Sequence, residues 1–383
     1  MRKIHLYLSL PFGILLTLIC FSGAMLVFEK EITSLTHPQR FQVEDTAKEP
    51  LPLDTLIRMV GKTIPDSVKI VSIAITNDPK ATYQFNLSQP RKASLIVNPY
   101  TGEVISQGGK TPFFQTMFKL HRWLLGPAKN ADGSIGWGKW LVGTSTLVFI
   151  GVLISGYALW WPRSRKALRN SLKIPFKKGL RPFSRGLHVA GGVYTGIFLL
   201  VMSITGLTWS FEWYRDGFYR LLGDNHHPQQ TIPSQSKDKN RKNAPKEPPR
   251  TKNTKTEYHW QKVYDEMLAL CPDFKKMTIS SGSVSVQYDK WGNQRAADKY
   301  ETDKSSGNIK KITSDSNTQP TNHLRGWVYT IHTGGFGGYF TRSLWFVSAL
   351  VGALLPLTGY YLWWKRIRNR NKKKKTKIKE KKN

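Results

Sequence analysis

Apolar residues are concentrated in four long stretches of the chain, and long polar segments separate them. The stretches run over Ile4–Phe28, Trp140–Trp161, Val189–Phe211 and Leu344–Trp364. A helix needs about 20 mostly apolar residues to cross the hydrocarbon core of a bilayer. Four buried helices of a soluble protein are the alternative, but the remaining chain would give them too little polar cover. The pattern therefore predicts a mainly α membrane protein with four transmembrane helices.

The first stretch also has features of a cleaved signal peptide. Arg2 and Lys3 precede it, and Ser22, Gly23 and Ala24 resemble a cleavage site. Its apolar part is longer than the apolar region of a typical signal peptide. We therefore expect it to remain in the protein as a membrane anchor.

The two long polar segments show the patterns of small α+β domains. Each has one helical pattern followed by short runs of alternating apolar and polar residues, which are typical of strands. In the first segment the helix is expected at Leu53–Ile64, with strands at Val68–Thr76, Thr82–Leu87, Ala93–Val97 and Glu103–Ile105. In the second the helix is expected at Tyr258–Leu270, with strands at Met277–Ser280, Ser283–Tyr288 and Ala297–Thr302, and another from Ile309. The tract 224–256 is polar and rich in Pro, Lys and Asn, which indicates a disordered linker.

The charge is strongly positive, and its placement indicates how the helices are oriented. Lys and Arg number 58 against 25 Asp and Glu, a net charge of +33. The segments before the first span, between the second and third, and after the fourth hold 23 basic residues and one acidic residue. They all fall on one side of a four-span topology, as the positive-inside rule requires of the cytoplasmic side. The excess therefore reflects topology and contact with anionic lipids, and we do not expect nucleic-acid binding.

These patterns divide the chain into spans, outer segments and cytoplasmic segments. Both termini are expected in the cytoplasm, and both long loops outside the cytoplasmic membrane. The expected spans are 4–28, 139–161, 188–211 and 342–364, the outer segments are 29–138 and 212–341, and the cytoplasmic segments are 1–3, 162–187 and 365–383. The two cysteines, Cys20 and Cys271, exclude a disulfide framework.

Comparison of the chain with itself shows that the second half repeats the first. Glycines follow His5 and His188 at the same offsets of 8 and 18 residues, and a glutamate follows each at 24 residues. The second and fourth spans both end in Gly-Tyr-x-Leu-Trp-Trp, and an aromatic-x-aliphatic-His element precedes each of them. The pattern predicts two tandem repeats, each made of a span, an outer domain, a histidine element and a span.

Four histidines occupy matched places in this repeat, His5 with His188 and His121 with His332. A lone histidine near a membrane end is usually just hydrogen-bonded within the helix bundle, but two matched pairs favour a ligand role. Neutral imidazole is the usual axial ligand of haem iron. Since no Cys-x-x-Cys-His attachment motif occurs, the prediction is two b-type haems. By depth, His5 pairs with His188 at the inner end, and His121 with His332 at the outer end.

Four further residues are candidates for the cofactor site. Gly23 and Gly206 lie five helical turns after His5 and His188, on the same helix faces, and a bare backbone there would give room for a macrocycle. Close helix packing is the alternative role of these glycines. Lys139 and Arg342 begin the outer ends of the second and fourth spans, where they would bind haem propionates or extend to the membrane interface.

Together these motifs resemble the PepSY-associated transmembrane family of bacteria, also described as iron-regulated or iron-uptake membrane proteins. The motifs that carry the resemblance are His5 with Ser22-Gly23, His121-Arg122, His188 with Thr205-Gly206, His332, and the two Gly-Tyr-x-Leu-Trp-Trp ends. The turn Asn98–Gly102 resembles the end of a PepSY domain. The resemblance implies an inner-membrane dihaem reductase with periplasmic PepSY-like domains, in which the four paired histidines hold the haem iron.

Two classes of function follow. The first is a haem-bearing electron-transfer protein that passes electrons outward to reduce ferric siderophores or other ferric chelates, with a membrane quinol or a cytoplasmic reductase as electron donor. The second is a non-redox PepSY protein that binds, inhibits or senses an extracytoplasmic partner. The repeated histidines favour the first class, because the second does not require them.

Overall fold

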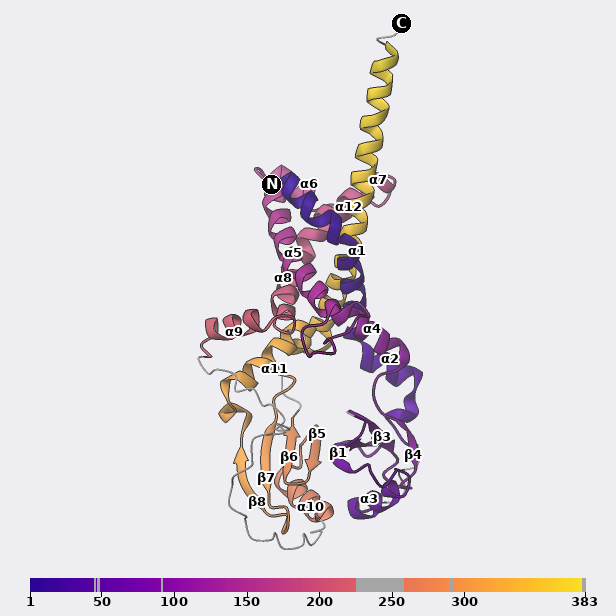
Figure 1. Ribbon diagram of the computed structural model, residues 1–383, viewed down its shortest axis with the longest axis vertical. Coiled ribbons are helices and arrows are strands. Elements are labelled where there is room, and N and C mark those ends of the chain that lie inside the picture. Colours follow the sequence, from indigo (N-terminus) through magenta and orange to yellow (C-terminus); the bar gives the residue numbers. More distant parts are fainter. Residues whose placement is uncertain (45, 47–48, 91, 225–257, 289–291, 381–383) are drawn as a thin grey trace.

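The computed structural model describes residues 1–44, 46, 49–90, 92–224, 258–288 and 292–380. A bundle of long helices forms one end of the molecule and an antiparallel sheet forms the other (Figure 1). The N-terminus, the C-terminal part of the last helix and the short helix α6 (Arg165–Ser171) all lie at the end away from the sheet. The predicted linker at 224–256 lies outside the described residues, apart from Asp224.

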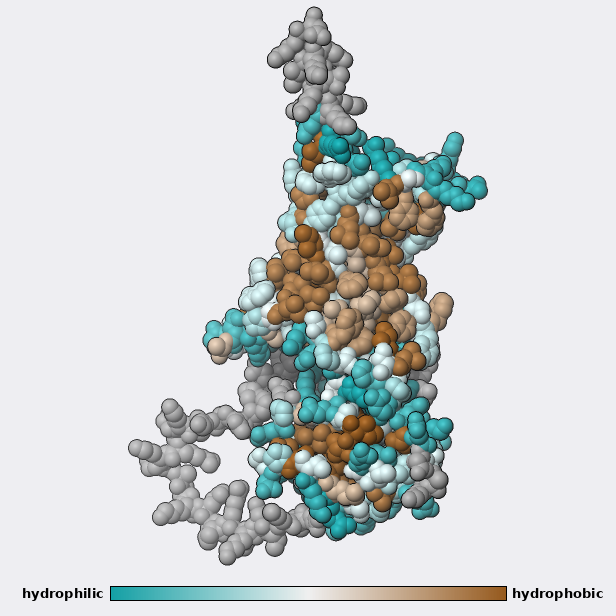
Figure 2. All heavy atoms as spheres, turned by 90° about the vertical axis from the view of Figure 1, so that its right-hand side faces the viewer, coloured by the Kyte–Doolittle hydropathy of each residue, from teal (hydrophilic) through white to brown (hydrophobic). Residues whose placement is uncertain are grey.

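Among the described residues, four helices are long and apolar enough to cross a membrane, which confirms the prediction from hydropathy. They occupy Arg2–Val27, Trp137–Trp160, Leu180–Leu207 and Gly335–Asn371. On the face shown in Figure 2, apolar residues cover the bundle in a belt with hydrophilic residues above and below it. A surface of this kind is stable in contact with lipid chains.

The four long helices form a closed ring. Helix α1 (Arg2–Val27) packs on α5 (Trp137–Trp160) and on α12 (Gly338–Glu380), and α8 (Gly192–Leu207) packs on the same two helices. Leu16, Phe149, Leu199 and Leu355 meet in the centre, one from each helix. Each long helix therefore presents one face to its neighbours and leaves the other for lipid.

The third and fourth spans differ in detail from the prediction. The third begins earlier, with α7 (Leu180–Gly186) and a π-helical turn at Leu187–Gly191, before α8. The fourth continues as one helix to Glu380, beyond the predicted span end at 364. Helix formation depends on the backbone rather than on lipid contact, so the helix does not have to stop where the apolar residues do.

The predicted strands are confirmed, with small shifts at their ends. The first loop contains α3 (Leu53–Gly61) and strands β1 (Ile70–Thr76), β2 (Tyr83–Leu87), β3 (Ser94–Val97) and β4 (Val104–Gln107). The second contains α10 (Trp260–Leu270) and strands β5 (Lys276–Ser280), β6 (Ser283–Gln287), β7 (Asp298–Thr302) and β8 (Ile309–Thr313). The turn at Asn98–Gly102 joins β3 to β4, and Gly102 adopts a positive φ of 73° that suits glycine.

The sequence predicts one small helix-and-strand unit in each loop, and in the structure the strands of the two units form one sheet. The strand order is β4-β3-β2-β1-β5-β6-β7-β8, and β1 pairs antiparallel with β5 from Ser72 opposite Ser280 to Thr76 opposite Lys276. One apolar core includes residues of both loops, with Leu56 of α3 and Met267 of α10 both fully buried. In two separate sheets β1 and β5 would both be edge strands; their pairing covers these two edges and leaves β4 and β8 as the edges of the joint sheet.

Short helices connect the sheet to the bundle. In the first half these are α2 (Glu29–Thr36), the 3₁₀ turn η1 (Pro38–Arg40) and α4 (Pro112–Trp123). In the second half they are α9 (Glu212–Leu221), α11 (Pro320–Thr333) and the 3₁₀ turn η4 (Gly335–Gly337). Helix α4 packs on α1 and α5, and α11 packs on α8, so each carries its histidine to the end of a long helix nearest the sheet.

Candidate functional site

The structure brings the four matched histidines together as two pairs, in the combination that depth predicts. His5 of α1 lies beside His188 of the π-helical turn, with 6.4 Å between ring centroids. His121 of α4 lies beside His332 of α11, with 6.1 Å between ring centroids. The two members of each pair are more than 180 residues apart in the chain, so only the folded structure brings them together.

Hydrogen bonds fix the rings of the inner pair. The Nδ1 atom of His188 donates to the carbonyl of Leu355 at 3.0 Å and to Oγ1 of Thr358 at 3.0 Å. The Nδ1 atom of His5 lies 3.0 Å from Oγ of Ser155, and that hydroxyl donates to the carbonyl of Val152. Because the serine proton is already used, the hydroxyl oxygen accepts from His5.

The outer pair is held in the same way. The Nδ1 atom of His121 donates to the carbonyl of Ile19 at 2.8 Å, and that of His332 donates to the carbonyl of Met202 at 3.0 Å. Burial lowers the pKa of His121. Burial lowers the pKa of His332 to about 3. Both rings are therefore neutral near pH 7.

These bonds determine which ring nitrogen carries a lone pair. A carbonyl only accepts hydrogen bonds, so the proton of each ring lies on Nδ1 and the lone pair on Nε2. In the described part of the chain, Nε2 of none of the four histidines makes a hydrogen bond. Histidine ligands of metals usually show this arrangement, with the other ring nitrogen donating to a carbonyl.

Glycines let the imidazole rings lie against the helix backbones. A Cβ atom on Gly23 would come within 2.8 Å of Cε1 of His121, and one on Gly206 within 3.0 Å of Cε1 of His332. Sequence reasoning placed these glycines on the helix faces of His5 and His188, and the structure shows that they adjoin the histidines of the outer pair. The glycine surfaces that were predicted to give room for a macrocycle therefore contact the imidazole rings of His121 and His332.

Two further glycines have a similar place at the inner pair and were not predicted. A Cβ atom on Gly156 would lie 3.5 Å from Cε1 of His5, and one on Gly359 would lie 3.4 Å from Cε1 of His188. Both begin the repeated Gly-Tyr-x-Leu-Trp-Trp motif. The repetition of this motif in the sequence could have indicated that the two glycines matter. The spacing of residues along one helix, however, does not show which histidine of another helix each glycine contacts.

Lys139 and Arg342, predicted as equivalent cations, differ in the structure. Arg342 forms a close ion pair with Glu31 of α2, and it also donates to the carbonyl of Val27 at the end of α1. Lys139 is half-buried and makes no ion pair with any described residue. Arg342 is thus paired with Glu31, whereas Lys139 has no ion-pair partner within the part of the chain that the structure describes.

A cavity of about 450 Å³ lies between the bundle and the sheet. Its walls come from the outer end of α1, from α2 and η1, from β2 and β3, and from α11 and α12. Tyr329 and Thr333, which flank His332 on α11, line it, and so do the cations Lys30, Arg40 and Arg342. The volume is within the range of small-molecule sites, and Thr333, one of the lining residues, directly follows His332 in the chain.

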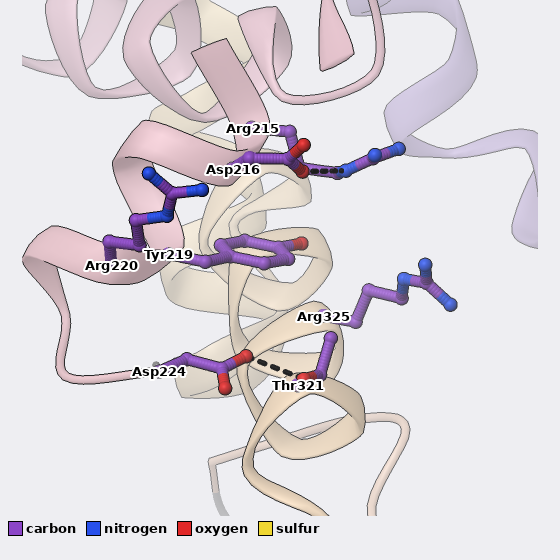
Figure 3. Close-up of a pocket in the computed structure, with 7 residues that line it drawn as sticks. All are labelled: Arg215, Asp216, Tyr219, Arg220, Asp224, Thr321 and Arg325. Carbon is purple, nitrogen blue, oxygen red and sulfur yellow. Dashed lines mark hydrogen bonds and ion pairs between the residues drawn. The ribbon is translucent and has the colours of Figure 1, made fainter. Parts of the chain in front are cut away.

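A second hollow lies between α9 and the start of α11, at the opposite end of α11 from His332. There the ring of Tyr219 lies between Asp216 and Asp224, and Asp224 accepts a hydrogen bond of 2.5 Å from Oγ1 of Thr321 (Figure 3). Its volume of about 10 Å³ is close to that of one water site. It is too small to be a substrate site.

Other metal chemistry finds little support in the described residues. No group of three or more His, Cys, Asp and Glu side chains there is arranged to hold a metal ion. A site built from two histidines and a macrocycle does not require such a group. The histidine pairs therefore remain the candidate cofactor positions.

Four membrane-crossing helices and an attached antiparallel sheet define a membrane protein of mixed α and β structure. The family described as the PepSY-associated TM region matches residues 2–366, so the chain belongs to that family. The resemblance inferred from the histidine and glycine motifs is thereby confirmed. No curated protein sequence matches the chain.

Proposed function

We propose that this protein is a haem-bearing electron carrier of the bacterial inner membrane that reduces ferric chelates, such as ferric siderophores, on the outer side. The observation that carries the proposal is the pair of two-histidine sites, each with Nδ1 bonded and Nε2 free. The ferric chelate is the substrate, and the two b-type haems are the implied cofactors.

The residues present fit a haem iron between the members of each pair. Two metal–imidazole bonds of about 2 Å each, with the radii of two rings, span roughly 6 Å. The observed ring-centroid distances are 6.4 Å and 6.1 Å. His5 and His188 would hold one haem, and His121 and His332 the other. A bis-histidine haem supplies one-electron transfer by cycling its iron between the ferric and ferrous states.

The separation of the two pairs supports transfer across the membrane. Gly23, which adjoins His121, follows His5 by 18 residues in the same helix, which corresponds to about 27 Å along the axis. That distance is close to the thickness of the bilayer core. We propose that electrons enter at the His5–His188 end and leave at the His121–His332 end.

The placement of charge supports the same direction. The N-terminus and α6, with its basic residues, lie at the end of the bundle away from the sheet (Figure 1). By the positive-inside rule that end is cytoplasmic, so the sheet and the 450 Å³ cavity lie outside. The basic surface would contact anionic lipids of the inner leaflet. An outer cavity is where a chelate too polar for the membrane would meet the protein.

We also propose that the two halves are tandem repeats with PepSY-like outer parts. Matching contacts support this. The hydroxyl of Tyr157 donates to the carbonyl of Val193 at 3.0 Å, and that of Tyr360 donates to the carbonyl of Leu10 at 2.5 Å. Val193 and Leu10 each follow an inner-pair histidine by five residues, so each half makes the same contact with the other.

The electron balance needs a donor from outside the protein. Each ferric chelate accepts one electron and becomes ferrous, and a membrane quinol or a cytoplasmic reductase would supply it. A quinol gives two electrons and two protons, which is enough for two chelates. Reduction favours release of the metal, because ferrous iron is held less tightly by hard oxygen ligands than ferric iron.

The test is the absorption spectrum and the haem content of the purified full-length protein. Pyridine haemochrome analysis should give about two b-type haems per chain. Liposomes that contain the protein, reduced from inside, should then produce ferrous iron outside from an added ferric chelate. A colourless protein from haem-replete cells would overturn the proposal and favour a non-redox role in binding or sensing an outer partner.

A further inference from the structure

The charges around the 450 Å³ cavity do not balance. Its charged lining residues are Glu29, Lys30, Arg40 and Arg342. Glu29 forms an ion pair with Lys110, and Arg342 forms one with Glu31. Those two pairs cancel, and the remaining lining charges are the cations of Lys30 and Arg40.

Neither of these cations has a carboxylate partner among the described residues. The guanidinium of Arg40 donates to the carbonyls of Gln107 at 3.0 Å and Gly109 at 2.8 Å, which are neutral acceptors. Lys30 makes no hydrogen bond or ion pair in the described part of the chain. Two cations that line one cavity and have no carboxylate in contact attract an anion.

Two further cations lie next to this cavity. The guanidinium of Arg295 stacks on the ring of Tyr329, with 3.7 Å to its centroid, and Tyr329 is a lining residue. Lys276 of β5 is partly buried, and that burial together with the charge of Lys30 lowers its pKa. Lys276 and Lys30 are therefore close enough to repel, although they come from opposite halves of the chain.

Three of the polar side chains among the remaining lining residues already donate their protons within the protein. Oγ1 of Thr33 and of Thr333 donates to helix carbonyls, and Nε2 of Gln84 donates to Asn86 and Ser94, so the charged donors left for a ligand are the cations. No aromatic cage or acidic cluster that would favour a cationic ligand is formed by the described lining residues. The walls also include the apolar side chains of Leu26, Val27, Phe41 and Ile96. The cations Lys30 and Arg40 are therefore the groups that favour an anion here.

We infer that this cavity binds ferric chelates with a net negative charge, of the hydroxycarboxylate type, in preference to neutral or cationic hydroxamate chelates. The inference rests on the proposed function for the identity of the metal, and on the cavity alone for the charge of the ligand. Lys30 and Arg40 contact the carboxylate oxygens of the chelate. Tyr329 and Thr333 then hold it beside His332, at the outer histidine pair.

Gallium(III) chelates test the inference, because gallium(III) forms the same type of complexes as iron(III) but is not reduced here. The full-length protein in lipid nanodiscs is titrated calorimetrically with gallium citrate, with citrate alone and with an uncharged gallium trihydroxamate. We expect gallium citrate to bind at least about tenfold more tightly than the trihydroxamate at low salt, with a smaller difference at high salt.

Substitutions at the cavity provide the second comparison. Lys30→Gln should weaken gallium citrate binding by about tenfold, since a charge-assisted contact is lost, and Lys30→Glu should weaken it further. Neither should change binding of the trihydroxamate. Lys62→Gln, an exposed lysine at the end of α3, is the matched control and should leave both affinities unchanged. Arg40→Lys keeps the charge and should retain most of the preference.

Three results would overturn the inference. They are equal binding of the charged and uncharged chelates, an affinity that Lys30→Gln and Lys30→Glu leave unchanged, and binding of citrate alone as tight as that of the gallium complex. Haem content is measured on the same samples. Haem without chelate binding would reject this inference and leave the proposed electron transfer intact, whereas selective chelate binding without haem would reject electron transfer only.

Discussion

At the scale of single residues, the candidate site depends on hydrogen bonds that orient the imidazole rings. Carbonyl oxygens of Ile19, Leu355 and Met202 accept from Nδ1 of three different histidines. In each ring the Nε2 lone pair is left free. The helices thus hold four imidazoles in the same tautomer without any charged partner, which suits an apolar surrounding.

The pairing of the histidines leads to a test by double substitution. His5→Ala should remove the inner haem and leave about half of the haem content, because the other pair keeps both ligands. His5→Ala with His188→Ala should then lose no more than either change alone, whereas His5→Ala with His121→Ala should lose nearly all haem. Haemochrome analysis of each variant gives the measurement.

His323→Ala is the control for these variants, because His323 is a partly exposed histidine of α11 outside both pairs. It should retain the haem content of the unchanged protein. If the double change at His5 and His188 removed all haem, the pairing derived from ring distances would be wrong.

Gly23 offers a second residue-level test. In Gly23→Ala the new methyl group would lie 2.8 Å from Cε1 of His121, so the ring has to move. Overpacking of this kind costs about 1–3 kcal/mol, and we expect loss of the haem at the outer pair with the inner haem retained. Thermal unfolding and haem content measure the two effects.

Gly217→Ala is the matched control, since Gly217 is also helical but has open space where its Cβ would be. It should be neutral or slightly stabilising, because alanine favours the helix by roughly 0.5–1 kcal/mol over glycine. Equal haem loss in the two variants would show that the contact between Gly23 and His121 is unimportant.

At the scale of elements, an ion pair joins the two halves at the end of the helix bundle that faces the sheet. Arg342 at the start of α12 pairs with Glu31 of α2, and the side chains are only 19% and 26% exposed. Burial alone would raise the pKa of Glu31, but the hydrogen bond and charge of Arg342 lower it overall. The pair therefore stabilises the contact between α2 and α12 while Glu31 is ionised.

Removal of this pair should show a defined pH dependence. Arg342→Gln should destabilise the protein by about 2 kcal/mol near pH 7, as expected for a hydrogen bond between charged groups. A depressed carboxylate pKa gives stability that is present above the unfolded pKa and is lost as the pH falls through the folded pKa. The difference in unfolding free energy should therefore shrink below about pH 4.

Glu266→Gln is the comparison for that experiment. It breaks the exposed pair with Lys262, in which the atoms are 3.8 Å apart and the side chains of Lys262 and Glu266 are 49% and 38% exposed. Exposed pairs contribute about 0–1 kcal/mol, so little change is expected at any pH. A pH-independent loss in Arg342→Gln would mean that packing or the bond to the Val27 carbonyl dominates instead.

At the scale of the whole molecule, the two halves share a sheet as well as a helix bundle. Strands β1 and β5 pair in the middle of the eight-stranded sheet, and the helices α3 and α10 bury their apolar faces in one core. The 450 Å³ cavity lies where the sheet, built from both halves, faces the helix bundle, which is also built from both halves. Its cations accordingly come from separate segments of the chain.

Disulfide formation tests the shared sheet. Ser72 of β1 and Ser280 of β5 are directly opposite, and opposite residues of antiparallel strands have Cα atoms about 4.5–5.5 Å apart. Ser72→Cys with Ser280→Cys should therefore form a disulfide under mild oxidation. Mass spectrometry of tryptic peptides should find the bond between the two loops.

Ser283 of β6 provides the matched negative control, because it is opposite Ser280 on the far side of β5. Two strand spacings place it roughly 9–10 Å from Ser72, beyond the reach of a disulfide. Ser72→Cys with Ser283→Cys should stay reduced. Equal cross-linking in both variants would contradict the β1–β5 register.

The sequence by itself determined the features that depend on local composition and period. Apolar runs such as Ile4–Phe28 are long enough to require a membrane, and alternation in runs such as Ser283–Tyr288 is sufficient for a strand, whatever their neighbours are. The equal offsets after His5 and His188 also indicated which residues correspond between the halves. The motifs were enough to indicate the family.

Only the tertiary structure decided the contacts between distant elements. Ile19 as acceptor for His121, Gly23 as the surface for its ring, and Glu31 as the partner of Arg342 all join segments that approach only after the bundle forms. The pairing of β1 with β5 has the same origin, since any unpaired edge strand can accept a neighbour and the sequence period does not name one. Local sequence patterns determine which face of each helix or strand is apolar. The packing of these elements against one another determines where the histidine pairs and the cavity form.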